Sequence, residues 1–163
     1  MSILIAYGGK YGTSRKCAEL LAELLTDASV IDLEKTKRPD LSMFDAVIVG
    51  GSVRYGLLNR SVKNFVLRNV QALRKKVTAY YICCGFISNA EQYFGTNFPK
   101  LALEHAIARE CLGGQFTPEI MSKFDKFILK AVTSNTEVKK QHKFPEIDMD
   151  AIKRLADKVK NAL

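Results

Sequence analysis

A glycine-rich segment near the N-terminus carries the residue types of a phosphate-binding loop. The apolar run 3–7 leads into Gly9 and Gly12, which are followed by the hydroxyl-bearing Thr13 and Ser14 and then by a helical pattern. Glycine lets backbone N–H groups approach an anion, and a helix N-terminus adds partial positive charge. The segment therefore predicts a phosphate site, with an ordinary strand-to-helix turn as the alternative.

The spacing of the glycines excludes two common nucleotide-binding loops. A Walker loop has four residues between its glycines and then Gly-Lys-Ser/Thr, whereas three residues separate Gly8 from Gly12 and Thr13 follows. A dinucleotide fingerprint needs Gly-x-Gly-x-x-Gly, and neither Gly8 nor Gly9 has a glycine two positions later. We therefore expect a mononucleotide.

Glycine beside aromatic residues recurs in two later segments, which we interpret as loops. Residues 50–56 read Gly-Gly-Ser-Val-Arg-Tyr-Gly, and residues 84–89 read Cys-Gly-Phe-Ile-Ser-Asn. Glycine allows close approach, and an aromatic face stacks on a flat ring. The pattern favours a planar, uncharged ring system, although Tyr55 and Tyr93 could be packing aromatics and Arg54 a surface arginine.

Apolar runs alternate with helical periodicity along the whole chain. The run 45–50 is too continuous to lie exposed on one side, which is typical of a parallel sheet covered on both faces. The alternation predicts an open parallel sheet whose ligand lies beyond the carboxyl ends of the strands. We expect strands at 2–7, 29–33, 45–50, 77–84 and 110–116, and helices at 14–25, 61–70, 89–109 (interrupted near 95–99), 119–133 and 148–162.

Over nearly its whole length the chain resembles the flavodoxin family. The strings 10–15 (Lys-Tyr-Gly-Thr-Ser-Arg), 51–56 (Gly-Ser-Val-Arg-Tyr-Gly) and 123–130 are similar to the branch that contains menaquinone-dependent protoporphyrinogen oxidase. The resemblance implies FMN as cofactor, bound where the first and third strands diverge. It also implies a single α/β domain over residues 1–163, with a doubly wound five-stranded parallel sheet of order 2-1-3-4-5 and helices on both faces.

The resemblance also assigns residues to the cofactor, with Tyr55 as the stacking aromatic. Electron-carrier flavodoxins usually have hydroxyl residues early in the phosphate loop, so here backbone N–H groups and Lys10 or Arg15 would carry more of the binding. The residues assigned to the phosphate are Gly9, Lys10, Tyr11, Gly12, Thr13 and Ser14. Those assigned to one side of the ring are Ser52, Val53, Arg54, Tyr55 and Gly56, and those assigned to its other edge are Cys84, Gly85, Phe86, Asn89 and Tyr93.

The composition of the chain limits the partners, the metal and disulfide chemistry and the cellular location that we expect. The 163 residues carry a net charge of +8, which suits an acidic partner, anionic lipid or a carboxylate substrate. No nucleic-acid motif is present, so we expect no nucleic-acid partner. The four cysteines follow no redox or zinc spacing, and only two histidines occur, so we expect neutral thiols, no disulfide framework and no metal. The chain enters a strand at once, without a signal peptide, which favours the cytoplasm.

Three functions remain open at this point. The first is an FMN-dependent oxidoreductase similar to protoporphyrinogen oxidase, which passes electrons from a porphyrinogen to quinone at the inner face of the membrane, with the basic helix 121–132 as contact. The second is a flavodoxin with an acidic redox partner, and the third a non-catalytic flavin-binding scaffold. No acid–base pair is evident, so we expect direct hydride or electron transfer, with Arg54 raising the reduction potential by favouring negative charge on reduced flavin. The apolar stripe of helix 121–132 could instead be core.

Overall fold

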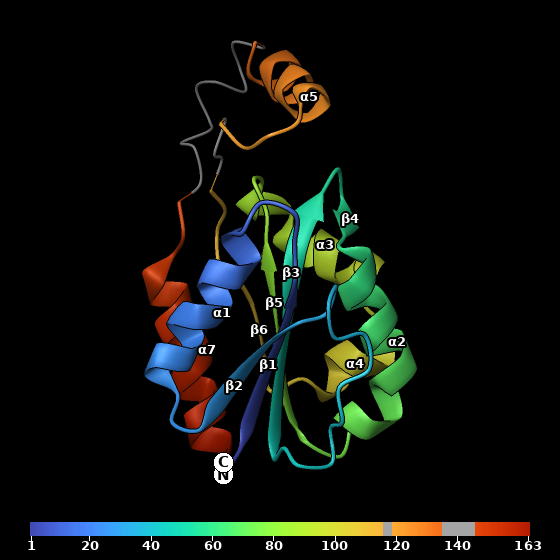
Figure 1. Cartoon of the computed structure of the whole chain (residues 1–163), viewed down its shortest axis with the longest axis vertical. Helices are drawn as coiled ribbons and strands as arrows, with labels where there is room; N and C mark the ends of the chain where they lie inside the picture. The colour runs from blue at the N-terminus through green and yellow to red at the C-terminus, as the bar shows by residue number, and fades with distance from the viewer. Residues whose placement is uncertain (116–118, 135–145) are drawn as a thin grey trace.

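The computed structural model describes residues 1–115, 119–134 and 146–163. Strands and helices alternate along the chain (Figure 1). In order they are β1 (Ile3–Gly8), α1 (Thr13–Leu24), β2 (Ala28–Asp32), β3 (Ala46–Arg54), β4 (Leu57–Leu58), α2 (Arg60–Leu73), β5 (Val77–Cys83), the 3-10 turn η1 (Ile87–Asn89), α3 (Ala90–Asn97), α4 (Lys100–His105), β6 (Ala108–Cys111), α5 (Lys123–Thr133) and α7 (Met149–Ala162).

The sheet has the strand order β2-β1-β3-β5-β6, and every neighbouring pair in this path is parallel. This confirms the predicted five-stranded, doubly wound arrangement. One strand was not predicted: the short β4 pairs antiparallel with the end of β3. Helices α1 and α7 cover one face of the sheet, and α2, α3 and α4 cover the other (Figure 1).

Side-chain alternation along the central strands builds a core on each side of the sheet. In β1, Ile3 and Ile5 pack toward α1 and α7, whereas Leu4 and Ala6 pack toward α2. All four are at most 3% exposed. Because both faces of the strand are buried, its sequence is a continuous apolar run, as expected for a parallel sheet.

The glycines of β3 do not end the strand, contrary to our expectation of a loop at 50–56. β3 continues to Arg54, so Ser52, Val53 and Arg54 are strand residues. A Cβ on Gly50 would lie 2.0 Å from Cε1 of Tyr81 on β5. Glycine is therefore needed here because the buried tyrosine ring fills the space that a side chain would occupy.

The segment after β5 agrees with the prediction in part. The interruption expected near 95–99 is confirmed, because the helical segment is divided into α3 and α4 and Pro99 stands at the N-terminus of α4. The edge strand β6 begins at Ala108 instead of residue 110 because it pairs with β5 from Ala79 onward. Of the strand predicted at 110–116, residue 116 lies outside the described residues. Residues 108–109, which the sequence pattern placed in a helix, thus form a strand because they pair with β5 at the edge of the sheet.

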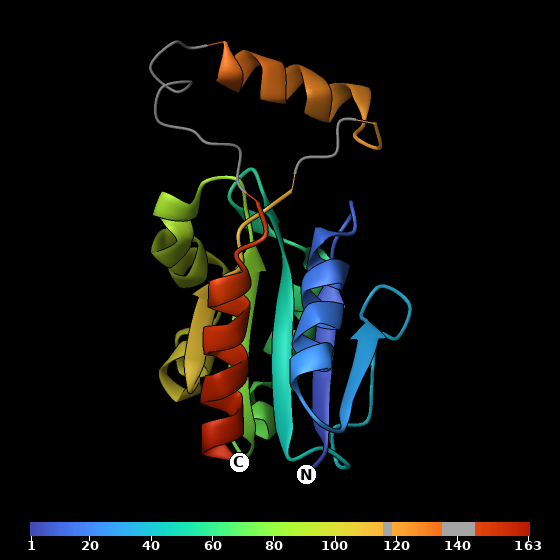
Figure 2. The same ribbon diagram turned by 90° about the vertical axis from the view of Figure 1, so that its left-hand side faces the viewer.

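Helix α5 lies across the carboxyl ends of the strands, at the opposite end of the molecule from both termini (Figure 2). It begins at Lys123 instead of residue 119, and the Ser122 hydroxyl accepts a bond from the Asp125 N–H as its cap. The C-terminal helix α7 is capped by Asp148, whose side chain accepts from the N–H groups of Asp150 and Ala151. Within the described ranges, no helix combines the length and apolar character that a membrane crossing requires.

Candidate functional site

The loop between β1 and α1 leaves the start of α1 without a side-chain cap. Gly12 occupies the N-cap position at φ 87°, and no side chain of the described residues caps the N–H groups that follow. The first turn of α1 also carries no acidic residue. An uncapped helix N-terminus offers several backbone donors and partial positive charge to an anion. This is the property expected of a phosphate loop.

A glycine and a buried hydroxyl lie beside this helix start. The Ser14 side chain is buried, and among the described residues its Oγ has no partner in hydrogen-bonding geometry. A Cβ on Gly9 would lie 2.8 Å from Ser14 Oγ and 3.3 Å from Ser52 Oγ. Gly9 thus leaves its own Cβ position free beside two hydroxyls, one from α1 and one from β3, and we call this position the space at Gly9. An unsatisfied buried hydroxyl calls for a partner, and the terminal phosphate of FMN fits this donor set.

The second predicted segment forms a two-residue hairpin at the end of β3. Tyr55 has φ 53° and Gly56 φ 76°, the two positive values that a type I′ turn requires. Buried Asn97 on α3 fixes this turn: its Oδ1 accepts from Leu58 N, and its Nδ2 donates to Gly56 O, both at 2.9 Å. Asn97 was not among the predicted site residues.

The third predicted segment follows β5 and approaches the hairpin. A Cβ on Gly56 would lie 3.9 Å from Cε1 of Tyr93. Asn89 Nδ2 in turn donates to the Tyr93 hydroxyl at 3.4 Å. The β3–β4 turn and the segment after β5 therefore lie side by side at the carboxyl ends of neighbouring strands. The structure brings together two of the predicted ring-binding segments here.

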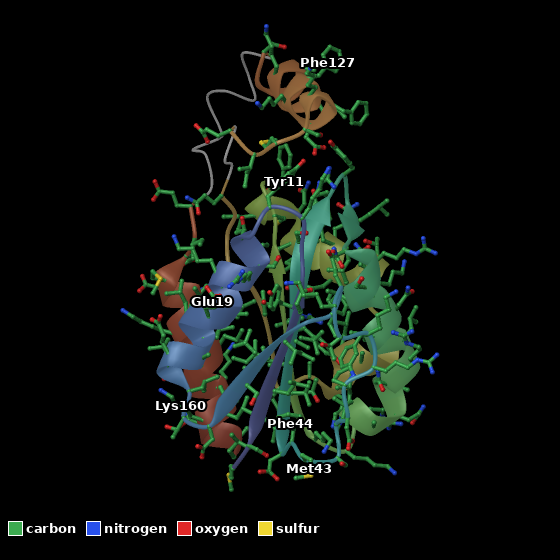
Figure 3. The ribbon with its side chains drawn as sticks, viewed as in Figure 1. Tyr11, Glu19, Met43, Phe44, Phe127 and Lys160 are labelled. Atoms are coloured by element: carbon green, nitrogen blue, oxygen red, sulfur yellow. The ribbon has the colours of Figure 1, made fainter. Side chains whose placement is uncertain are left out.

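Residues from the first two segments converge on the carboxylate of Asp125 in α5. We call Lys10, Tyr11, Arg54 and Tyr55 the donor cluster. Oδ1 of Asp125 accepts from Arg54 Nη2 at 2.5 Å and from the Tyr55 hydroxyl. Oδ2 accepts from the Tyr11 hydroxyl, from Lys10 Nζ at 3.4 Å and from Ser122 Oγ at 2.8 Å. Figure 3 shows Tyr11 just beneath α5.

Burial and hydrogen bonding act in opposite directions on Asp125. Its side chain is only 4% exposed, and this burial alone would raise the pKa of the carboxyl group. Hydrogen bonds from Tyr11, Tyr55 and Arg54 outweigh burial and hold the pKa far below its ordinary value. The same carboxylate raises the pKa of Tyr55 through its hydrogen bond. Asp125 is therefore ionised at every physiological pH.

The exposed surface of α5 is apolar as well as basic. Phe124 is 65% exposed and Phe127 69% exposed, and Lys123 and Lys126 are also exposed. Phe124 packs edge-on against Tyr55, with ring centroids 6.5 Å apart. Phe127 lies on the side of α5 away from the sheet (Figure 3). The two phenylalanines are thus not core residues, which was the alternative reading of this stripe.

Two pairs of thiols lie near the site. Cys84 Sγ lies 3.4 Å from Cys111 Sγ, at the ends of β5 and β6. A hydrogen bond from Cys84, opposed by burial, lowers the pKa of Cys111 to about 7. Cys83 and Cys17 are 3.7 Å apart and buried, and the hydrogen bond to Cys17 together with burial raises the pKa of Cys83. In the described part of the chain, no group of three or more His, Cys, Asp or Glu could hold a metal ion.

Some predicted residues take other partners. Arg15, expected near the phosphate, bonds to Glu19 on α1 at 2.8 Å. Tyr55, expected to stack on the ring, directs its hydroxyl to Asp125. Asp125 itself was missed because Ser-x-x-Asp at 122–125 has the spacing of a helix cap, which gave no reason to look for another role.

The sequence matches both a family model and curated proteins. The family model described as a flavodoxin domain matches residues 4–143. Protoporphyrinogen IX dehydrogenase [quinone] of Escherichia coli K12 is 29% identical over 85 residues, which cover 50% of this chain and 47% of that protein. The chain thus matches about half the length of this curated relative.

Solved structures show the same fold. An archaeal flavodoxin has a TM-score of 0.56 at 18% identity, covering 98% of this chain and 99% of that one. A flavoprotein of Lactobacillus acidophilus NCFM, in complex with FMN, has a TM-score of 0.54 at 15% identity, covering 68% and 92%. The chain belongs to the flavodoxin domain family, whose cofactor is FMN.

Proposed function

We propose that this chain binds FMN at the carboxyl ends of β1, β3 and β5, as a single domain over residues 1–163, and acts as an oxidoreductase. The observation that carries the proposal is the space at Gly9, where the buried Ser14 hydroxyl lacks a partner beside an uncapped helix start. FMN would supply its phosphate to this space and its redox-active ring to the neighbouring segments.

The protein's own residues would bind and orient the cofactor. Backbone N–H groups at the start of α1 and the Ser14 hydroxyl would hold the phosphate. The β3–β4 turn and the segment 84–89, with Tyr93, would border the ring. We assign no nucleophile among the residues that the structure describes, and the chain's role would be to position the ring, tune its charge environment and limit its contact with water.

For the reaction we favour the type carried out by protoporphyrinogen oxidases, with electrons passing to a quinone. The 29% identity to the Escherichia coli protein supports this, although it covers only half of each chain. The positive charges of Lys10 and Arg54 would favour the approach of a carboxylate-bearing substrate. The test is anaerobic oxidation of a porphyrinogen by the FMN-loaded protein with a quinone acceptor. Turnover that depends on both FMN and quinone supports the proposal, and its absence contradicts it.

The alternative is electron transfer to an acidic protein. The exposed Lys123 and Lys126 on α5 favour it, because a basic helix beside the ring would attract an acidic partner. Reduced protein should then transfer electrons rapidly to an acidic acceptor, with a rate that falls as ionic strength rises. A rate independent of salt contradicts this alternative.

The exposed phenylalanines and lysines of α5 also suit the surface of an anionic membrane, where a quinone would be reached. Flotation with anionic vesicles should show binding that salt weakens. Lys126→Glu combined with Lys130→Glu should abolish it, and Lys153→Glu combined with Lys158→Glu on α7 provides a control with the same charge change. Equal loss of binding in both double variants would mean that α5 is not the contact.

A further inference from the structure

Asp125 accepts more hydrogen bonds than are needed to hold α5 against the rest of the protein. Five side chains donate to its two oxygens: a guanidinium, an ammonium, two phenols and one serine hydroxyl. An ionised carboxylate has about four acceptor positions, so both oxygens are saturated. Charged donors make such bonds shorter and stronger than neutral ones. The set has the composition of a recognition site for an anion.

Four of the five donors do not belong to the segment that carries Asp125. Lys10 and Tyr11 precede α1, and Arg54 and Tyr55 lie at the β3–β4 turn. Both pairs of donors follow or end strands that are paired neighbours, β1 and β3. The sheet therefore positions these donors independently of α5. Only Ser122 comes with the helix. The donor cluster would therefore remain in place if Asp125 withdrew.

The charges of the cluster are not balanced. Lys10 and Arg54 contribute two positive charges, and Asp125 contributes one negative charge. Neither cation pairs with another carboxylate in the ranges that the structure describes. Both cations also lie over the Tyr11 ring, 5.1 Å and 5.4 Å from its centroid. Withdrawal of Asp125 would leave a partly enclosed site with an uncompensated charge of +2, which is a strong attraction for another anion.

We propose that the donor cluster recognises a carboxylate group of a small organic acid that reacts at the flavin, and that Asp125 occupies this site until the acid displaces it. The inference rests on the proposed function, because the same residues line the place assigned to FMN. It deepens that function by naming the group through which the substrate is held. Asp125 then acts as an internal competitor carried by α5.

The enclosure of the site favours a small acid over an acidic protein. The Asp125 side chain is 4% exposed, whereas Lys10 is 48% and Arg54 36% exposed. A slender carboxylate arm can enter where Asp125 now lies. A carboxylate on a folded protein surface would bring neighbouring atoms against α5 and the Tyr55–Phe124 contact. We therefore assign the site to a small molecule.

The test compares benzoate with benzamide, which have the same shape but differ in charge. Both are titrated into the FMN-loaded wild type and Asp125→Asn, followed by amide chemical shifts in NMR. The variant removes the competing charge, so it should bind benzoate about tenfold or more tightly than the wild type, an effect typical of one charged hydrogen bond. Benzamide should bind equally weakly to both proteins.

The control is Asp157→Asn, which removes one charge from the exposed surface of α7. If Asp157→Asn increased the affinity for benzoate as much as Asp125→Asn does, the cause would be the net charge of the protein, and the assignment would be overturned. Arg54→Gln added to Asp125→Asn should cancel the gain. The assignment is also overturned if the variant with both substitutions still binds benzoate more tightly than the wild type. It is overturned as well if neither Asp125→Asn nor Asp125→Ala binds benzoate more tightly. Tighter binding of polyglutamate without tighter binding of benzoate would assign the site to an acidic protein instead.

Failure of the carboxylate site can be distinguished from failure of the proposed function. FMN binding is measured first for each variant. If FMN does not bind, the proposed function fails, and benzoate can still be titrated by tyrosine fluorescence, since the chain contains no tryptophan. If FMN binds and benzoate shows no gain in Asp125→Asn or Asp125→Ala, only the carboxylate site is lost.

Discussion

Arg54 and Asp125 are 71 positions apart in the sequence, and Nη2 of the arginine lies 2.5 Å from Oδ1 of the aspartate. The arginine ends β3, and the aspartate lies in the first turn of α5. The pair therefore connects the helix above the sheet to the strand that borders the proposed ring site. It also changes the expectation for Arg54, whose positive charge is largely compensated in this arrangement.

The first prediction concerns the midpoint potential of bound FMN. Asp125→Asn removes the compensating charge, so the reduced flavin, which carries negative charge, should become more favourable and the potential should rise. Arg54→Ala should lower it. We expect shifts of about 30 mV, equivalent to a tenfold change in a two-electron equilibrium, measured by spectroelectrochemical titration. Asp157→Asn should leave the potential unchanged, and shifts of the same sign in both site variants would contradict the account.

The second prediction concerns the space at Gly9. Gly9→Ala places a methyl group 2.8 Å from Ser14 Oγ, so it should weaken FMN binding by roughly tenfold or more, about 1.4 kcal/mol. The control is Gly95→Ala on α3, where a Cβ meets nothing within 4 Å. That variant should keep its FMN affinity and gain about 0.5–1 kcal/mol of stability, as alanine does in a helix. Equal FMN affinity in Gly9→Ala and the wild type would contradict the phosphate assignment.

The third prediction concerns the thiols. The pKa of Cys111 is lowered to about 7, first by the hydrogen bond from Cys84. The thiolate is the reactive form, so alkylation of Cys111 by iodoacetamide should rise with pH, with a midpoint near 7. Cys84→Ser retains a donor, whereas Cys84→Ala removes it and should move the midpoint upward. Buried Cys17 and Cys83 should stay unmodified in the folded protein, and peptide mapping that finds them alkylated before Cys111 would refute the prediction.

The fourth prediction concerns Asn97, which joins α3 to the β3–β4 turn. Asn97→Ala would leave the buried Leu58 N–H without its partner. We expect a loss of about 2–3 kcal/mol in the free energy of unfolding, because an unsatisfied buried donor retains its full desolvation cost. Urea unfolding measures this, and Gln92→Ala, exposed on the same helix, should change stability by less than about 0.5 kcal/mol. A similar small change in Asn97→Ala would show that the amide does not hold the turn.

Sequence patterns predicted the elements whose burial is continuous or periodic. The apolar run of β3 and the helical spacing of Ile152, Leu155 and Val159 on α7 reflect burial within single elements, and the structure confirms both. The predicted strand ended at Gly50, where a loop was expected to begin, whereas β3 continues to Arg54. The requirement for glycine at position 50 comes from Tyr81, a residue of another strand. Glycine alone does not distinguish a bend from a close contact.

The candidate site was predictable only where its residues follow one another in the chain. Segment 9–14 follows β1, and segment 52–56 comprises the end of β3 and the turn after it, so their position at one sheet edge was foreseeable. Asp125 was not, because it meets Tyr11 and Arg54 across 114 and 71 positions. Its type and spacing suited a helix cap, and no local pattern distinguishes a capping aspartate from one that also binds distant donors.

The central claim is that the space at Gly9 and Ser14 holds the phosphate of FMN. Calorimetric titration with FMN and with riboflavin, which lacks the phosphate, tests it most directly. The account predicts that FMN binds at least about tenfold more tightly than riboflavin, a difference of 1.4 kcal/mol, and that Ser14→Ala reduces this difference. No heat with FMN, or equal affinity for the two flavins, would contradict it.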